Sequence, residues 1–81
     1  MDKVRIQFTN YSGHIFYLYK GSDGYWRISS QNGINEAFSN FSKNSMLLKF
    51  ALEDAFSAQD AKDALIKYGN GVKDAYVLGS V

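Results

Sequence analysis

The sequence predicts a single small α+β domain over residues 1–81, with an antiparallel sheet and one helix packed on one face. Hydrophobic and polar residues alternate with a period of two in the first third of the chain. Helical spacing appears from residue 58, and a β-rich segment follows it. The expected element order is β-β-β-β-α-β, with four to five strands in the sheet.

The first strand is predicted from Val4, Ile6 and Phe8, which alternate with polar neighbours as in a half-buried strand. Residues 10–13 read Asn-Tyr-Ser-Gly, a combination typical of turns. Residues 14–20 are dense in aromatic and β-branched side chains, which favour strands. A hairpin of two strands is therefore expected.

A third strand is predicted at residues 25–30. The preceding loop, Gly-Ser-Asp-Gly at residues 21–24, has two glycines that can adopt a positive φ. Trp26 and Ile28 then fall on one face of the strand. The three predicted strands form an antiparallel meander.

Residues 31–45 are rich in Asn, Ser and Gly, and their structure is left open. Ile34, Phe38 and Phe41 are isolated apolar residues at spacings that fit either a helical turn or an irregular loop. The segment is either a loop pinned to the core or a contact loop in which Phe38 and Phe41 are the anchors.

A fourth strand is predicted at residues 46–54 by a second stretch of alternation. Its inward residues would be Met46, Leu48, Phe50 and Leu52. The competing interpretation is one continuous helix from residue 46 to residue 68.

The helix is predicted at residues 58–68. Ser57 and Asp60 resemble a capping box before it, and Gly69 is a natural C-cap after it. Residues 72–78 predict the final strand.

The outer face of the predicted sheet carries an unusual set of side chains. We expect Tyr17 and Tyr19 to point outward, and not Phe16 and Leu18, because a phenol tolerates partial exposure better. Lys3 is expected on the same face. The candidate binding residues on this face are Arg5, Tyr17, Tyr19, Tyr25 and Arg27.

Three interpretations fit such a face. It could be a solvated surface of cross-strand Tyr and Arg pairs. It could bind a protein, because Tyr and Arg are enriched in interface hot spots. It could also stack single-stranded bases while its cations contact phosphates. The net charge of +1 disfavours this third interpretation, because nucleic-acid binders neutralise several phosphates.

Residue content argues against catalysis. The chain has no Cys and a single His, which excludes a thiolate nucleophile and the common zinc sites. His14 stands beside a turn, and no serine lies in a nucleophile-elbow sequence. We therefore expect no enzyme activity, no metal and no cofactor. The absence of Cys and of a long apolar run also predicts a cytoplasmic protein without membrane segments.

Two segments near the C-terminus resemble a known family. Residues 61–69, Ala-Lys-Asp-Ala-Leu-Ile-Lys-Tyr-Gly, and residues 75–80, Ala-Tyr-Val-Leu-Gly-Ser, are similar to the helix-then-strand tail of small phage-encoded anti-CRISPR proteins. The resemblance implies a bacterial host cell, a CRISPR effector complex as partner and steric inhibition. No residue role is carried over from the family.

The predicted function is that of a non-catalytic protein-binding module, in line with this resemblance. The alternative is a single-stranded nucleic-acid-binding protein that uses the aromatic and basic sheet face. The sequence leaves open whether the protein is a monomer or a homodimer.

Overall fold

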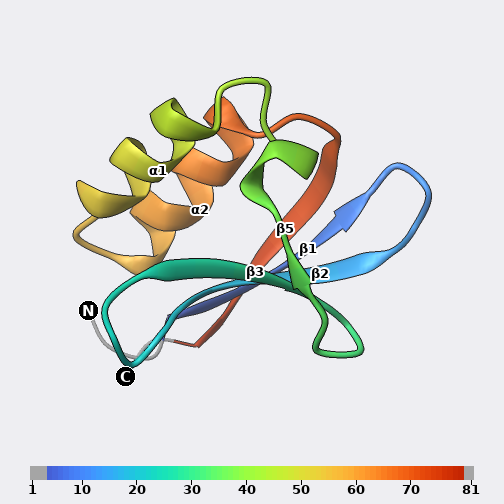
Figure 1. The fold of residues 1–81 in the computed structure, drawn as a ribbon, viewed down its shortest axis with the longest axis horizontal. Coiled ribbons are helices and arrows are strands. Elements are labelled where there is room, and N and C mark those ends of the chain that lie inside the picture. The colour runs from blue at the N-terminus through green and yellow to red at the C-terminus, as the bar shows by residue number, and fades with distance from the viewer. Residues whose placement is uncertain (1–3, 80–81) are drawn as a thin grey trace.

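The computed structural model describes residues 4–79, which form an antiparallel sheet covered on one face by two helices (Figure 1). The sheet has five strands in the order β4-β3-β2-β1-β5. The predicted α+β class is therefore confirmed. The elements are β1 (Arg5–Asn10), β2 (Ile15–Lys20), β3 (Trp26–Ser30), β4 (Asn35–Glu36), the 3₁₀ turn η1 (Phe38–Asn40), α1 (Ser45–Glu53), α2 (Ala58–Tyr68) and β5 (Val72–Gly79).

Strands β1, β2 and β3 form the predicted meander. Leu18 lies opposite both Ile6 and Ile28, so the apolar residues of the three strands share the face beneath the helices. The first turn is closed by the Asn10 side chain, whose Oδ1 accepts hydrogen bonds from the backbone N–H groups of Ser12 and His14 at 3.0 and 2.9 Å.

The segment that the sequence left open, residues 31–45, contains β4, η1 and the approach to α1. Phe41 is buried, and its ring packs edge-on against Phe8 and Phe16 with centroids 5.2 and 4.7 Å away. Phe38 is half-buried against the core. Phe41 therefore pins this segment to the core, in agreement with the first of the two alternatives.

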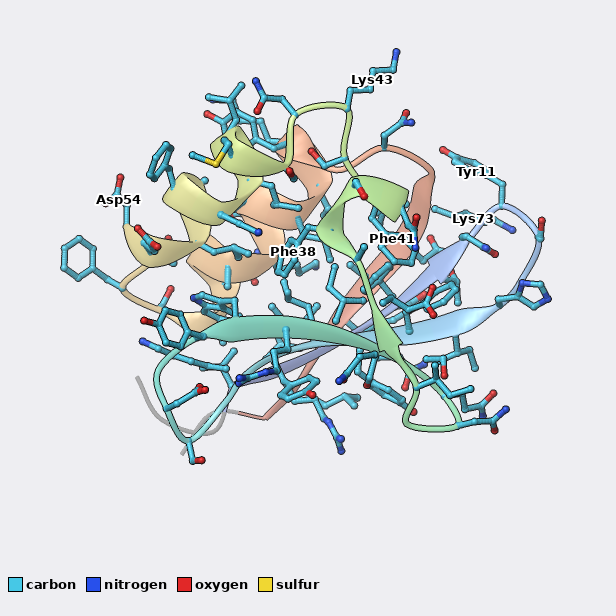
Figure 2. The ribbon with its side chains drawn as sticks, in the orientation of Figure 1. Tyr11, Phe38, Phe41, Lys43, Asp54 and Lys73 are labelled. Atoms are coloured by element: carbon cyan, nitrogen blue, oxygen red, sulfur yellow. The ribbon has the colours of Figure 1, made fainter. Side chains whose placement is uncertain are left out.

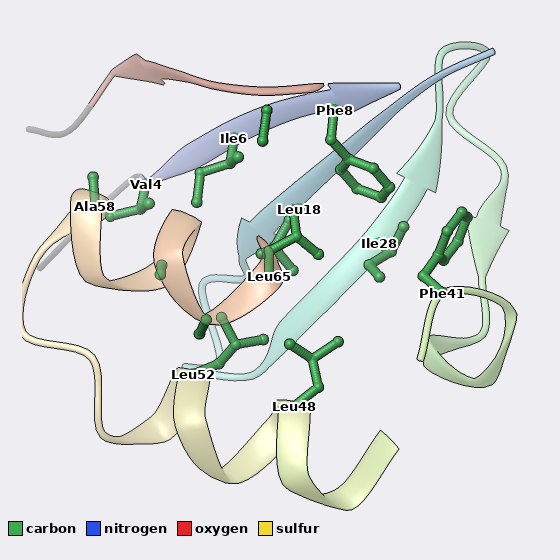
Figure 3. Packing of buried hydrophobic residues seen from close by; sticks show 13 residues of the cluster. Val4, Ile6, Phe8, Leu18, Ile28, Phe41, Leu48, Leu52, Ala58 and Leu65 are labelled. Atoms are coloured by element: carbon green, nitrogen blue, oxygen red, sulfur yellow. The ribbon is translucent and has the colours of Figure 1, made fainter. Parts of the chain in front are cut away.

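The predicted strand at residues 46–54 is wrong, because residues 46–53 lie in α1 and Asp54 is its C-cap. Asn44 caps the helix by accepting a hydrogen bond from the Leu47 N–H at 3.2 Å. Leu48 and Leu52, one helical turn apart, are fully buried, whereas alternate strand positions such as Phe50 are exposed. Figure 3 shows both leucines pointing from α1 toward the sheet.

The expectation of one helix on the sheet is corrected to two helices, and the continuous helix from 46 to 68 is also wrong. Helix α1 ends at Glu53, and a loop at residues 54–57 separates it from α2. The fourth strand is instead the short β4, within the segment whose structure the sequence left open.

Helix α2 spans the predicted residues 58–68, and Ser57 caps it by accepting the Asp60 N–H at 3.1 Å. Gly69 follows as the C-cap in an extended conformation, with φ of −73°. A glycine is needed there because a Cβ atom would collide with the Leu65 carbonyl oxygen. Gly71, with φ of +82°, then turns the chain into β5.

The core lies between the sheet and the helices. Ala61 and Ala64 are buried on α2, and their small side chains allow this helix to approach the sheet closely. Leu65 fills the space between the helix and the central strands (Figure 3). No helix within residues 4–79 is long and apolar enough to cross a membrane.

The helical state of α1 predicts unequal effects of substitutions along it. Leu48→Ala should lower the free energy of unfolding by about 3 kcal/mol, because it leaves a cavity in the core. Met46→Ala should lower it by less than about 1 kcal/mol, because this side chain is exposed. Urea denaturation followed by circular dichroism measures both values. Equal losses at the two positions would contradict the helix.

Candidate interaction surfaces

The structure brings four of the five predicted binding residues together on the sheet face opposite the helices. We call this surface the outer sheet face. Tyr19 lies directly between Arg5 on β1 and Arg27 on β3, and Tyr17 shares its orientation. The outward orientation of the two tyrosines is thus confirmed. Tyr25 is exposed in the loop before β3. Lys3 lies outside the described residues.

Both arginines of the outer sheet face already have partners within the chain. The Arg5 guanidinium carbon lies 4.8 Å from the ring centroid of Tyr17, a cation–π contact that covers one face of the ring. Arg27 binds Asp23 through two hydrogen bonds, Nη1 to Oδ1 at 2.8 Å and Nη2 to Oδ2 at 2.6 Å. The predicted cations are therefore engaged in local contacts.

The Arg27 guanidinium holds the pKa of Asp23 well below its ordinary value. Its hydrogen bonds are the largest cause, and a further bond from the Tyr25 backbone N–H acts in the same direction. Reciprocally, Asp23 raises the pKa of Arg27. The pair fixes the β2–β3 loop, and it lies at the solvent-exposed surface.

Tyr76 joins the outer sheet face, and sequence analysis missed it. It lies directly opposite Gln7, which in turn lies opposite Tyr17, so Gln7 separates the two tyrosines on the same face. The missing information was the pairing of β5 with β1, which places the last strand beside the first. The alternation of Tyr76 with the buried Ala75 is the local signal that could have identified its face.

A second surface was not predicted and lies on the helix layer. Met46, Leu47 and Phe50 point out from α1 with 57, 50 and 53% of their area exposed, and Phe56 in the next loop is 92% exposed. Met46 and Phe50 are one helical turn apart, and Leu47 precedes Phe50 by three residues, so the three side chains are neighbours on the helix. We call these four residues the α1 surface.

Charged residues border the α1 surface. Lys43 and Asp54 lie at the two ends of the helix and point away from the sheet in Figure 2. Lys49 and Glu53 lie along the side of the helix that faces β3. The surface therefore has an apolar centre and a rim of both charge signs, as many protein interfaces do.

A groove of about 490 Å³ runs beside this helix, between α1 and the β3–β4 edge. Lys49 forms part of its wall, and its Nζ lies 5.2 Å from the ring centroid of Phe38. Trp26, which is partly buried, lines the groove from the sheet, whereas Ile28 beside it is fully buried in the core. None of the four residues of the α1 surface lines this groove, which lies on the side of the helix that carries Lys49 and Glu53.

The described residues offer few groups for chemistry. Within residues 4–79, no cluster of three or more His, Cys, Asp or Glu side chains could hold a metal ion. His14 is exposed beside the first turn. The absence of enzyme activity stays a prediction.

Comparisons with known proteins found no matching family model, and no curated protein or solved structure matches the chain. The expected relationship to anti-CRISPR proteins thus stays a prediction. The surfaces themselves must supply the functional inference.

The Arg27–Asp23 pair predicts a pH dependence of stability. Folding lowers the pKa of Asp23, so the ion pair stabilises the protein at pH values above the ordinary carboxyl pKa of about 4. This stabilisation is lost as the pH falls toward the pKa of Asp23 in the folded protein. Wild type should therefore exceed Asp23→Asn in stability at neutral pH, and the difference should shrink in acid. Urea denaturation across pH measures this difference. A constant difference would contradict the ion pair.

Proposed function

We propose that this protein is a non-catalytic protein-binding module whose principal contact is the α1 surface. One observation carries the proposal: Met46, Leu47 and Phe50 are exposed as neighbours on one short helix, and Phe56 is exposed in the loop after it. Isolated exposed apolar residues are ordinary, but a group of this kind marks interaction sites on soluble proteins.

The fold does not account for these exposed side chains. Leu48 and Leu52 already fill the interface between α1 and the sheet. Met46 and Phe50 project on the opposite side, where their exposure is unfavourable in the free protein. Burial against a partner would regain about 25 cal/mol for each Å² of apolar surface removed from water.

The partner that fits is a protein with an apolar groove. A short helix with apolar residues at positions i, i+1 and i+4 matches the helix-in-groove mode of recognition. Lys49 and Glu53 at the rim would then set the orientation, because rim charges contribute more to specificity than to affinity.

The outer sheet face is the weaker candidate for the principal contact. A base would have to compete with Arg5 for the ring face of Tyr17, and a phosphate would have to compete with Asp23 for Arg27. Both contacts favour a solvated face whose arginines are already paired within the chain. They also disfavour the alternative function, single-stranded nucleic-acid binding.

A CRISPR effector complex is the partner implied by the resemblance of residues 61–69 and 75–80 to anti-CRISPR proteins. Within the described residues, 61–68 lie in α2 and 75–79 lie in β5. Under this proposal the protein acts in the bacterial cytoplasm and inhibits by occupying a surface of the complex. The α1 surface would supply the contact, and no chemistry is required.

The experiment is a pull-down of tagged protein from bacterial lysate, with and without nuclease, read by mass spectrometry. Wild type should retain a stoichiometric protein after nuclease treatment. The double variant Met46→Ala/Phe50→Ala should weaken binding of that partner at least about tenfold, as expected when interface hot spots are removed. Titration with the purified partner measures the change.

Two matched controls accompany this experiment. Ile34→Ala removes an exposed apolar side chain in the β3–β4 turn, away from α1, and should leave affinity unchanged. Tyr17→Ala/Arg27→Ala tests the outer sheet face and should also retain the partner. Loss of binding in this sheet variant alone would refute the α1 surface. Recovery of nucleic acid only, lost on digestion, would favour the alternative function.

A further inference from the structure

Strand β5 forms one edge of the sheet and, among the described residues, pairs only with β1. The orientation of its backbone groups follows from β1. Hydrogen bonds join Lys20 N–H to the Val4 carbonyl and Asn10 N–H to the His14 carbonyl. Because strand residues alternate, the even-numbered residues of β1 direct their backbone groups toward β2 and the odd-numbered ones toward β5.

This alternation determines which β5 groups face outward. Gln7 directs its backbone groups toward β5, where it lies opposite Tyr76. Tyr76 is therefore bonded to β1, and its two neighbours, Ala75 and Val77, turn their N–H and C=O groups to the open edge. Such an edge is a template for pairing with another strand.

The pairing between β1 and β5 is regular in the middle and irregular at both ends. Register shifts occur between Arg5 and Ile6 and between Thr9 and Asn10. The strand residues between them, 74–77, form an uninterrupted stretch opposite β1. Bulges protect the ends of an edge strand by twisting it away, but this central stretch has no such protection.

We propose that β5 pairs with β5 of a second copy of this chain, antiparallel and about a two-fold axis at Tyr76. In this register Tyr76 lies opposite its own counterpart. Ala75 lies opposite Val77 of the second copy, and both residues have the outward-facing groups needed to exchange hydrogen bonds. The sheet continues across both copies.

The side chains of β5 fit a second copy in this register. Tyr76 and Leu78 have 55 and 53% of their area exposed, and paired tyrosines across the axis would bury much of that apolar area. Asp74 lies opposite Leu78 of the second copy and not opposite the second Asp74, so no like charges meet. This inference does not rest on the proposed function, because the α1 surface takes no part in it.

Cross-linking tests the register directly, because the chain contains no Cys. Residues opposite each other in a non-hydrogen-bonded antiparallel pair have Cα atoms about 4.5 Å apart, within the range for a disulfide. Tyr76→Cys should therefore form a covalent dimer under mild oxidation. Asp74→Cys should not, because its counterpart lies farther along the strand. Tyr25→Cys is the control, because Tyr25 lies far from β5 in the loop before β3 and is even more exposed than Tyr76, at 69% against 55%.

Sedimentation velocity from micromolar to millimolar concentration tests the association without cross-linking. Wild type should reach the mass of a dimer. Tyr76→Lys and Tyr76→Glu should each be monomeric, because like charges meet at the axis, and an equimolar mixture of the two should regain the dimer. A monomeric wild type up to millimolar concentration would overturn the proposal. So would a dimer that both variants retain, or a cross-link from Asp74→Cys as efficient as that from Tyr76→Cys.

Discussion

The packing of α2 against β1 and β5 is the contact on which the rest of this structure depends. The alanines of α2, among them Ala61, let the helix approach the sheet closely, so that Leu65 reaches the central strands. Gly69 and Gly71 then return the chain directly into β5, which pairs with β1. A domain of this size buries only roughly 60% of the surface of its unfolded chain, so the core is filled by few residues. Several apolar side chains, including those on α1 and β5, are left at the surface.

The meander and α2 could be predicted from the sequence, because each shows one clear hydrophobic period and is bounded by recognisable turns or caps. The sequence was insufficient for α1 because Leu48 and Leu52 are four residues apart, a spacing that satisfies both strand alternation and one helical turn. The Asn44 cap and the packing of both leucines against the sheet decide in favour of the helix. This error also hid the α1 surface, because a strand would have buried Met46 and Phe50 in the core.

The outer sheet face and the α1 surface differ in whether their exposed side chains already have partners within the chain. On the outer sheet face, Arg5 covers Tyr17 and Arg27 binds Asp23, so a partner would have to displace existing contacts. Sequence analysis predicted the residues of this face and their orientation, but it could not foresee these contacts, which depend on the sheet register and the β2–β3 loop. On the α1 surface, a partner would bury the apolar area of Phe50 and Phe56 without displacing a polar contact of these side chains. The residue types alone favour the outer sheet face as the binding site. The free energy gained by removing exposed apolar area from water favours the α1 surface.

Pairing through β5 would also determine how the α1 surface is presented. A two-fold axis that extends an antiparallel sheet stands perpendicular to it, so the helices of both copies lie on the same side. The two α1 surfaces would then face a common target with a fixed separation and no flexible linker between them. Once the first surface binds a repetitive partner, the second binds as an intramolecular step at high effective concentration. An assembly with repeated subunits would therefore be bound more tightly than a single subunit, without any additional contact within either copy.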